Sequence, residues 1–244
     1  MLKNALVATV LVMFGSAALA CAAEKDDVQA AVKKLSDSGY SWKQTTEGGA
    51  GAAAGRGGGA VEGKFQADGL TWVSRTGGNN TTVFIIKGDK GAIKAGDADW
   101  VSLDDAQNDQ AAQRAARGAK SFKLPTVQAA TTIDGVKEFA KADDAYSADL
   151  SEEAVKQLMT FGGGRGRGGA NANANATPPQ ITNAKGTVKV WLKDGALTKI
   201  VYNVQGTISI NGQDRDINRT TTTEFSDVGT TKIDVPAEAK TKIG

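Results

Sequence analysis

Residues 188–210, VKVWLKDGALTKIVYNVQGTISI, alternate apolar and polar side chains on both sides of Asp194-Gly195. A period of two places alternate side chains on one face of a β-strand, and Asp-Gly is typical of the two-residue turn of a hairpin. This stretch therefore predicts a β-hairpin with one apolar face. The apolar residues expected on this face carry even numbers: Val188, Val190, Leu192, Ile200, Tyr202, Val204, Ile208 and Ile210.

Shorter stretches with the same signals lie on both sides of this hairpin. Residues 61–67 alternate small or apolar with polar side chains, and Gly-rich or Asn-rich turns at 68–69 and 77–80 separate the runs that follow. An antiparallel sheet with helices over one face, an α+β fold, accounts for this order. The further strands that we expect are residues 41–47, 61–67, 70–75, 81–87, 92–94, 100–103, 220–225 and 232–235.

Four stretches have the composition or spacing of helices. Residues 26–36 repeat apolar side chains every three or four positions, which is one face of an amphipathic helix. Residues 104–120 are rich in Ala, Gln and Arg and predict a helix with an exposed, polar surface. Residues 133–139 and 151–161 complete the set, and Ser151 is the expected N-cap of the last helix.

Two glycine-rich stretches interrupt the pattern. Residues 48–59 (GGAGAAAGRGGG) and 162–179 (GGGRGRGGANANANATPP) hold too few apolar side chains to pack, so we expect flexible loops. Arg56, Arg165 and Arg167 lie within them without aromatic neighbours, whereas proteins that bind single-stranded nucleic acids combine basic side chains with aromatic ones. The loops therefore favour solvated surface segments, with no nucleic acid as partner.

The N-terminus has the organisation of a secretory signal peptide. Lys3 precedes an apolar run from Ala5 to Phe14, and small residues follow up to Ala20. We expect residues 1–20 to be the signal peptide and residues 21–244 to form a single domain. Cys21 directly follows the expected cleavage site, which predicts lipidation of its side chain and a membrane anchor. Ordinary cleavage nearby, with Cys21 incidental, is the open alternative.

Composition excludes several classes of active site. The chain has no histidine and no cysteine after Cys21, so a Ser-His-Asp triad, a cysteine nucleophile beyond Cys21 and His/Cys ligation of zinc or haem are absent. We expect no cofactor, no metal and no catalytic residue. The pairs Asp104-Asp105, Asp143-Asp144 and Glu152-Glu153 are the remaining acid–base candidates, and each lies where a turn or a helix start accounts for it. A net charge of +2 indicates no strongly charged partner.

The strand order and turn placement resemble those of the LolA/LppX-like superfamily of bacterial periplasmic lipoprotein carriers and lipoproteins. The resemblance is carried by residues 190–195 (VWLKDG), 197–204, 220–227 and 233–236 (IDVP), and by two earlier hairpins at 65–72 and 83–94. It implies a strongly curved antiparallel sheet, an incomplete barrel, wrapped around helices. It also implies that acyl chains or lipidated proteins lie between sheet and helices, which is binding and not turnover.

An apolar face opposite loosely apolar helices can leave a cleft for a hydrocarbon chain. Each buried methylene contributes about 0.8 kcal/mol, so an acyl chain needs no ion pair to be held. A packed core with no ligand is the alternative interpretation of the same residues. The expected lining residues are Phe65, Trp72, Phe84, Val190, Leu192, Ile200, Tyr202, Val204, Ile208 and Phe225, with Leu158 and Met159 opposite them.

These observations lead to one main hypothesis. The sequence favours a protein of the bacterial periplasm, anchored to the outer membrane through Cys21, that holds a lipid, an acyl chain or a lipidated protein end in an apolar cleft. A soluble periplasmic or secreted form is the alternative localisation. The alternative functions are an anchored structural or interaction protein with a filled core, and a hydrolase that uses two carboxylates.

Overall fold

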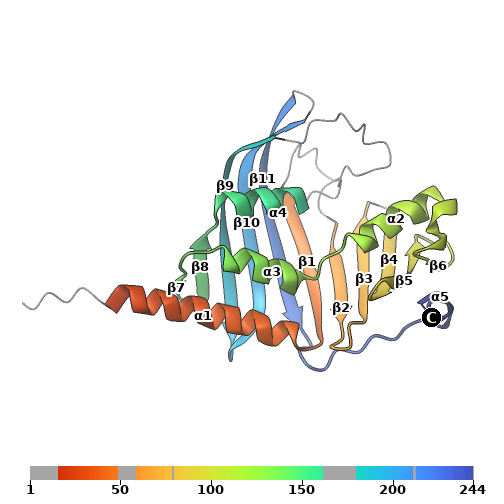
Figure 1. The fold of residues 1–244 in the computed structure, drawn as a ribbon, viewed down its shortest axis with the longest axis horizontal. Coiled ribbons are helices and arrows are strands. Elements are labelled where there is room, and N and C mark those ends of the chain that lie inside the picture. Colours follow the sequence, from red (N-terminus) through yellow and green to blue (C-terminus); the bar gives the residue numbers. More distant parts are fainter. Residues whose placement is uncertain (1–15, 49–58, 79, 162–179, 211–212, 244) are drawn as a thin grey trace, which may run out of the picture.

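The computed structural model describes residues 16–48, 59–78, 80–161, 180–210 and 213–243. Within these ranges eleven antiparallel strands form one continuous sheet, and five α-helices pack against it (Figure 1). The expected α+β class is therefore confirmed. The terminal strands β6 (Val101–Ser102) and β7 (Ala140–Ala142) lie at opposite ends of the strand order, so the sheet is open and is not a closed barrel.

The strand order is β6-β5-β4-β3-β2-β1-β11-β10-β9-β8-β7. Two local meanders meet where β1 pairs with β11, from Ser41 opposite Ser226 to Gly48 opposite Arg219. The long β9–β10 pair contains two register shifts, and such bulges bend a strand and increase its twist. The other strands are β1 (Tyr40–Gly48), β2 (Val61–Phe65), β3 (Thr71–Gly77), β4 (Asn80–Lys87), β5 (Lys90–Ala95), β8 (Ala145–Asp149), β9 (Gln180–Lys193), β10 (Ala196–Ile210) and β11 (Gln213–Ser226).

Four helices cover one face of the sheet, which we call the helix-covered face. Helices α1 (Ser16–Ser36) and α3 (Pro125–Asp134) run side by side across the β7–β11 half, with α4 (Glu152–Phe161) beside them (Figure 1). Helix α2 (Gln110–Lys120) covers β4 and β5. The short C-terminal helix α5 (Ala237–Ile243) packs on the opposite face, where Ala239 meets Ile85 and Ala92.

The expected helix over 133–139 is wrong. Pro125 occupies the first turn of α3, where its missing N–H costs no hydrogen bond, and the helix ends at Asp134 before Gly135. The following residues lead into β7 and β8, two short strands rich in Ala that the alternation pattern did not reveal. Proline after Leu124 therefore marks the start of the helix.

Two other expectations need correction. Residues 232–235 form no strand, and they lead instead into α5. The helix expected over 104–120 is divided into a 3₁₀ turn, η1 (Asp105–Asn108), and α2, because the Asp109 side chain accepts a hydrogen bond from the Ala112 N–H and caps α2. Helix α2 is also not an exposed element, since it buries Ala112, Ala116 and Ala119.

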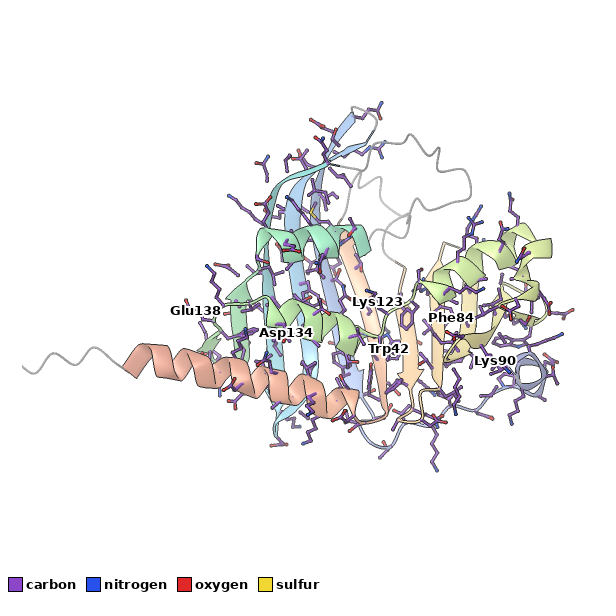
Figure 2. All side chains as sticks on the ribbon, in the orientation of Figure 1. Trp42, Phe84, Lys90, Lys123, Asp134 and Glu138 are labelled. Atoms are coloured by element: carbon purple, nitrogen blue, oxygen red, sulfur yellow. The ribbon has the colours of Figure 1, made fainter. Side chains whose placement is uncertain are left out.

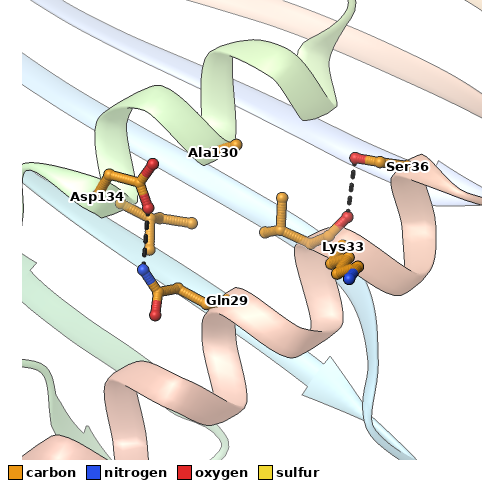
Figure 3. A pocket seen from close by; sticks show the side chains of 7 residues that line it. Gln29, Lys33, Ser36, Ala130 and Asp134 are labelled. Atoms are coloured by element: carbon orange, nitrogen blue, oxygen red, sulfur yellow. Dashed lines mark hydrogen bonds between the residues drawn. The ribbon is translucent and has the colours of Figure 1, made fainter.

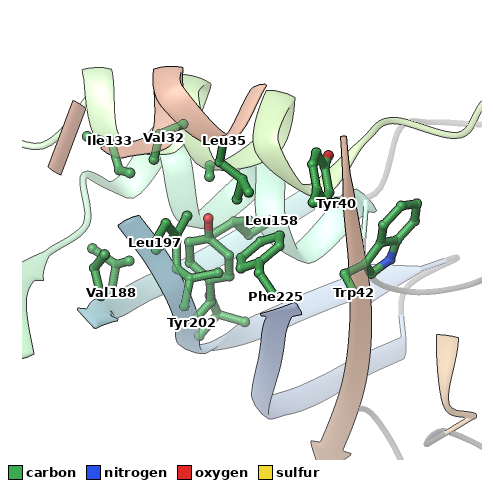
Figure 4. Close-up of a cluster of buried hydrophobic side chains, with 14 of the residues drawn as sticks. Val32, Leu35, Tyr40, Trp42, Ile133, Leu158, Val188, Leu197, Tyr202 and Phe225 are labelled. Carbon is green, nitrogen blue, oxygen red and sulfur yellow. The ribbon is translucent and has the colours of Figure 1, made fainter. Parts of the chain in front are cut away.

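The main core lies between the helix-covered face and its helices. Tyr40 is fully buried at its centre, and its ring lies 5.4 to 5.7 Å from the rings of Trp42, Phe65 and Phe225. The Tyr40 hydroxyl forms a 2.9 Å hydrogen bond with the Thr126 hydroxyl of α3. Figure 4 shows Leu197, Tyr202 and Phe225 rising from the strands toward Leu35 and Leu158 of the helices.

Candidate ligand-binding interior

Most of the expected lining residues lie together on the helix-covered face. Strand pairing sets Ile200 opposite Val190 and Phe225 opposite Trp42, so their side chains share that face. The flanking pairs place Leu192, Tyr202, Val204 and Ile208 in the same cluster. The prediction that one face of the 188–210 hairpin is apolar and buried is thus confirmed, although the side chain of Ile210 lies outside the described residues.

The N-terminal strands extend this surface. Phe65 is paired with Tyr40, and Phe84 is paired with Val73, which brings both phenylalanines under the helices. Phe122, just after α2, lies 6.0 Å from the Trp42 ring and 5.4 Å from the Phe84 ring. Trp42 and Phe84 both lie in the part of the sheet next to α2 (Figure 2).

Trp72 lies on the opposite face. Because neighbouring residues of a strand point to opposite sides, the burial of Val73 under the helices turns Trp72 away from them. Its ring belongs to the smaller cluster that Ile85 and Ala239 form beneath α5. The fold therefore separates Trp72 from the other eleven expected lining residues.

Helix α4 covers the strands from above. The Ser151 hydroxyl accepts a hydrogen bond from the Ala154 N–H at 3.2 Å, which confirms the expected N-cap. Leu158 and Met159 are then buried against β9 and β10, opposite the sheet residues. Glycine permits this close approach, because a Cβ at Gly186 would lie 3.0 Å from Val155 Cγ2 of α4.

Side chains of the protein fill this interior. Phe84, Val190 and Ile200 are each exposed by 1% or less, so other atoms of the protein surround them. A ligand between sheet and helices therefore requires α3 or α4 to move outward. Movements of helices that slide over a packed face are a known mode of conformational change.

Two hollows lie elsewhere on the described surface. One of about 280 Å³ lies between α1 and α3, where Gln29 Nε2 donates a 2.9 Å hydrogen bond to Asp134 Oδ1 (Figure 3). The other, of about 610 Å³, lies on the face opposite the helices and is lined by charged side chains, among them Lys43, Lys64 and Glu224. Neither hollow includes the expected lining residues of β9 and β10.

Among the described residues, three buried side-chain polar atoms have no hydrogen-bond partner. They are Tyr202 Oη, Arg219 Nε and Arg75 Nε. Burial raises the pKa of the Tyr202 hydroxyl above its usual range, and the Thr132 side chain offsets this only in part. Burial lowers the pKa of the Arg75 and Arg219 guanidinium groups, because desolvation disfavours a charge.

The two arginines differ in what compensates their charge. The Arg75 guanidinium lies 5.3 Å from the ring centre of Phe84 and 5.4 Å from that of Phe122, so two aromatic faces stabilise it. Arg219 is 6% exposed and donates from one terminal nitrogen to the Leu158 carbonyl of α4. Among the described residues, neither arginine has a carboxylate within the 4.0 Å of an ion pair.

Sequence reasoning missed both arginines, although a signal for one of them existed. In β11 the odd-numbered positions from Ile217 to Phe225 face the helices, and Arg219 is among them. Extending the alternation back from Phe225 would have placed a charged side chain in the apolar interior. Such a conflict between pattern and residue type often marks a functional site.

The N-terminal expectations fall largely outside the described residues. Residues 1–15 and both glycine-rich stretches, apart from Gly48 and Gly59 at their ends, lie outside the described ranges. Cys21 lies within α1, and its side chain is not among those described. In the described part of the chain, no helix has both the length and the apolar character needed to span a bilayer.

Comparison with known proteins gives matches at the level of structure only. No family model matches the chain, and no curated protein sequence matches it. The fold is similar to that of LprF from Mycobacterium bovis, with 12% identity, 89% of this chain and 98% of that chain covered, and a TM-score of 0.43. It is also similar to the LolA superfamily protein NE2245 from Nitrosomonas europaea, with 9% identity, 88% and 94% covered, and a TM-score of 0.28.

Proposed function

We propose that this protein binds an acyl chain, free or as part of a lipid, between the helix-covered face and its helices. One observation carries the proposal: an extended apolar interior retains Tyr202 Oη and Arg219 Nε without partners. Buried polar groups in a finished core are nearly always hydrogen-bonded. An amphiphilic ligand would supply both the apolar contacts and the missing acceptors.

The energetics of acyl binding are compatible with a filled interior. Moving about 12 methylenes out of water contributes roughly 10 kcal/mol. That gain can offset the partial separation of a short helix from the sheet, and α4 has only 10 residues. The acyl chain would take the place of the Leu158 and Met159 side chains against β9 and β10.

The finer proposal concerns where the protein acts. The sequence of residues 1–21 supports export to the bacterial periplasm and attachment to the outer membrane through a lipid on Cys21. There the protein would hold a lipid, or the acylated end of another protein, away from water. The intact mass of protein from the membrane fraction tests the anchor, because a diacylglyceryl group on Cys21 adds a defined mass.

A second candidate follows from the tight packing of the interior. Phe84, Val190 and Ile200 are each exposed by 1% or less, which favours an anchored interaction protein that holds no ligand. The two candidates predict different behaviour of α4, since only a ligand requires this helix to move.

Native mass spectrometry of protein purified without detergent separates the candidates. Acyl binding predicts co-purified lipid and saturable binding of an acyl-chain fluorophore. Met159→Ala, inside the interior, should change the affinity several-fold, whereas Thr160→Ala, on the exposed side of the same helix, should not. Absence of both lipid and saturable binding would favour the interaction protein.

A further inference from the structure

The two unpartnered donors under α3 and α4 are neighbours on one strand pair. In the β10–β11 register, Arg219 lies opposite Val204 and Tyr202 lies opposite Thr221. Arg219 and Tyr202 are therefore diagonal neighbours on the helix-covered face, with backbone positions on the order of 7–8 Å apart. Long side chains bridge such a separation.

Arg219 is a buried cation with little to balance its charge. Within the described part of the chain, its guanidinium donates a hydrogen bond to the neutral Leu158 carbonyl, and Nε has no acceptor. A guanidinium has five N–H donors, and an isolated buried charge is costly unless an anion accompanies it. No carboxylate of the described residues lies within ion-pair distance.

Tyr202 adds a second donor to the same region. Its side chain is 4% exposed, and its hydroxyl makes no hydrogen bond of normal length with the described residues, although the Thr132 side chain is close enough to lower its pKa. The nearby Thr132 hydroxyl of α3 donates to the Gln128 carbonyl at 2.8 Å. The β10–β11 pair thus presents a guanidinium and a hydroxyl, both able to donate.

We propose that Arg219 and Tyr202 form a subsite for the anionic head group of the acyl ligand, a carboxylate or a phosphate. This inference rests on the proposed function and adds the class of ligand. Oxygens of the head group accept hydrogen bonds from Arg219 Nε and Tyr202 Oη, and the negative charge balances the guanidinium. The hydrocarbon chain then extends over the apolar residues of β9 and β10.

Arg75 provides a matched control. It is a half-buried arginine on the helix-covered face whose Nε is buried and, among the described residues, has no carboxylate within ion-pair distance, but Phe84 and Phe122 contact its guanidinium. No second unpartnered donor lies beside it among the described residues. The structure therefore assigns the head group to Arg219 and not to Arg75.

Competition binding with three ligands of equal chain length tests the subsite. Palmitate, palmitoyl lysophosphatidate and hexadecanol are each titrated against an acyl-chain fluorophore bound to the purified full chain. The proposal predicts that at least one of the two anionic lipids binds about tenfold or more tightly than hexadecanol. Whichever anion has the advantage identifies carboxylate or phosphate as the preferred head group.

Three variants test which residues cause the preference for an anionic lipid over hexadecanol. Arg219→Met should abolish the preference for the anion while leaving hexadecanol binding intact, and Tyr202→Phe should reduce the preference several-fold. Arg75→Met should leave the preference unchanged. Circular dichroism verifies folding, and Tyr202→Phe carries the test if Arg219→Met does not fold.

The outcomes separate the two proposals. Equal affinity for all three ligands, or a folded Arg219→Met variant that keeps the preference, overturns the head-group subsite and leaves acyl binding in place. Loss of the preference in Arg75→Met instead of Arg219→Met also overturns it. Failure of all three ligands to bind overturns acyl binding together with the subsite. A lower melting temperature of Arg219→Met with an unchanged preference would show a structural role only.

Discussion

At the scale of single residues, the contact between Trp42 and Gly63 shows how the sheet accommodates its aromatic core. These residues are paired across β1 and β2, and the Trp42 ring lies over the Cα of Gly63, where any Cβ would overlap it. Gly63 occupies an apolar position in the alternation of residues 61–67, yet its role is to leave space. The alternation pattern placed Gly63 on the correct face of the strand, but it could not predict that the Trp42 ring covers this position.

Gly63→Ala should therefore destabilise the protein by about 1–3 kcal/mol, because the added methyl group forces the indole out of its packed position. Urea unfolding followed by tryptophan fluorescence measures the change. Gly77→Ala is the control, since no atom lies within 4 Å of a Cβ at that end of β3. Equal loss of stability in both variants would contradict this account.

Tyr40 predicts a pH dependence in the alkaline range. Burial raises the pKa of its hydroxyl from 10.0 to about 12, so the unfolded chain loses this proton at a lower pH than the folded chain. The contribution of the protonated Tyr40 hydroxyl to the free energy of unfolding is fully present below pH 10 and is lost as the pH rises toward 12. From this group the free energy of unfolding should fall by roughly 2–3 kcal/mol over that range.

Urea unfolding at pH 8 to 12 compares the chain with Tyr40→Phe. The variant loses the hydrogen bond to Thr126 at every pH but should show a shallower decline above pH 10. An identical decline would mean that Tyr40 is not the group that titrates.

Single residues also show which parts of the candidate site can be predicted from the sequence alone. Alternation brought nine of the ten expected lining residues that lie on strands to one face, because strand geometry is periodic. Trp72 was expected on that face, while the register of β3 turns Val73 inward instead. Arg219 was missed because an apolar interior is expected to contain no unpaired charge.

At the scale of elements, α4 is the helix on which the proposed binding depends. Its N-terminus is fixed by Ser151, and an ion pair of 2.6 Å joins Lys156 to Glu152 on its solvent side. The start of this helix followed from the sequence, since Ser at the N-cap and acidic residues in the first turn are strong signals. Helices α3 and α5 were harder to predict. The sequence placed a helix at 133–139, whereas α3 begins at Pro125, and α5 has only seven residues.

Ser151→Ala should lower the stability of α4 by about 1 kcal/mol through loss of the cap. Hydrogen exchange resolved by peptide should show faster exchange in residues 152–161 and unchanged exchange in α1. Thr160→Ala, at the other end of α4, serves as the comparison. Unchanged exchange in α4 of Ser151→Ala would mean that the cap does not hold the helix in place.

At the scale of the whole molecule, the pairing of β1 with β11 unites two meanders that are distant in sequence. Each meander could be predicted from local turns, because hairpins join neighbouring segments. The joining pair could not, since alternation carries no information about which distant strand is the partner. The antiparallel α+β class followed from the sequence, and the strand order required the structure.

The resulting molecule has two unlike faces. Helices cover an apolar face with buried, unpartnered donors, whereas charged side chains line the hollow of about 610 Å³ on the other. An acyl chain should distinguish these faces, because only the first offers an extended apolar surface. The location of a bound chain is therefore the decisive observation.

Photo-crosslinking with a palmitate analogue that carries a diazirine near the end of its chain measures this location directly. Peptide mass spectrometry of the full chain should find the crosslinks in β9, β10 and α4, near Val190, Ile200 and Leu158, and unlabelled palmitate should suppress them. Crosslinks that concentrate on the opposite face, around Lys64 and Trp72, or that resist competition by palmitate, would contradict an acyl-binding interior.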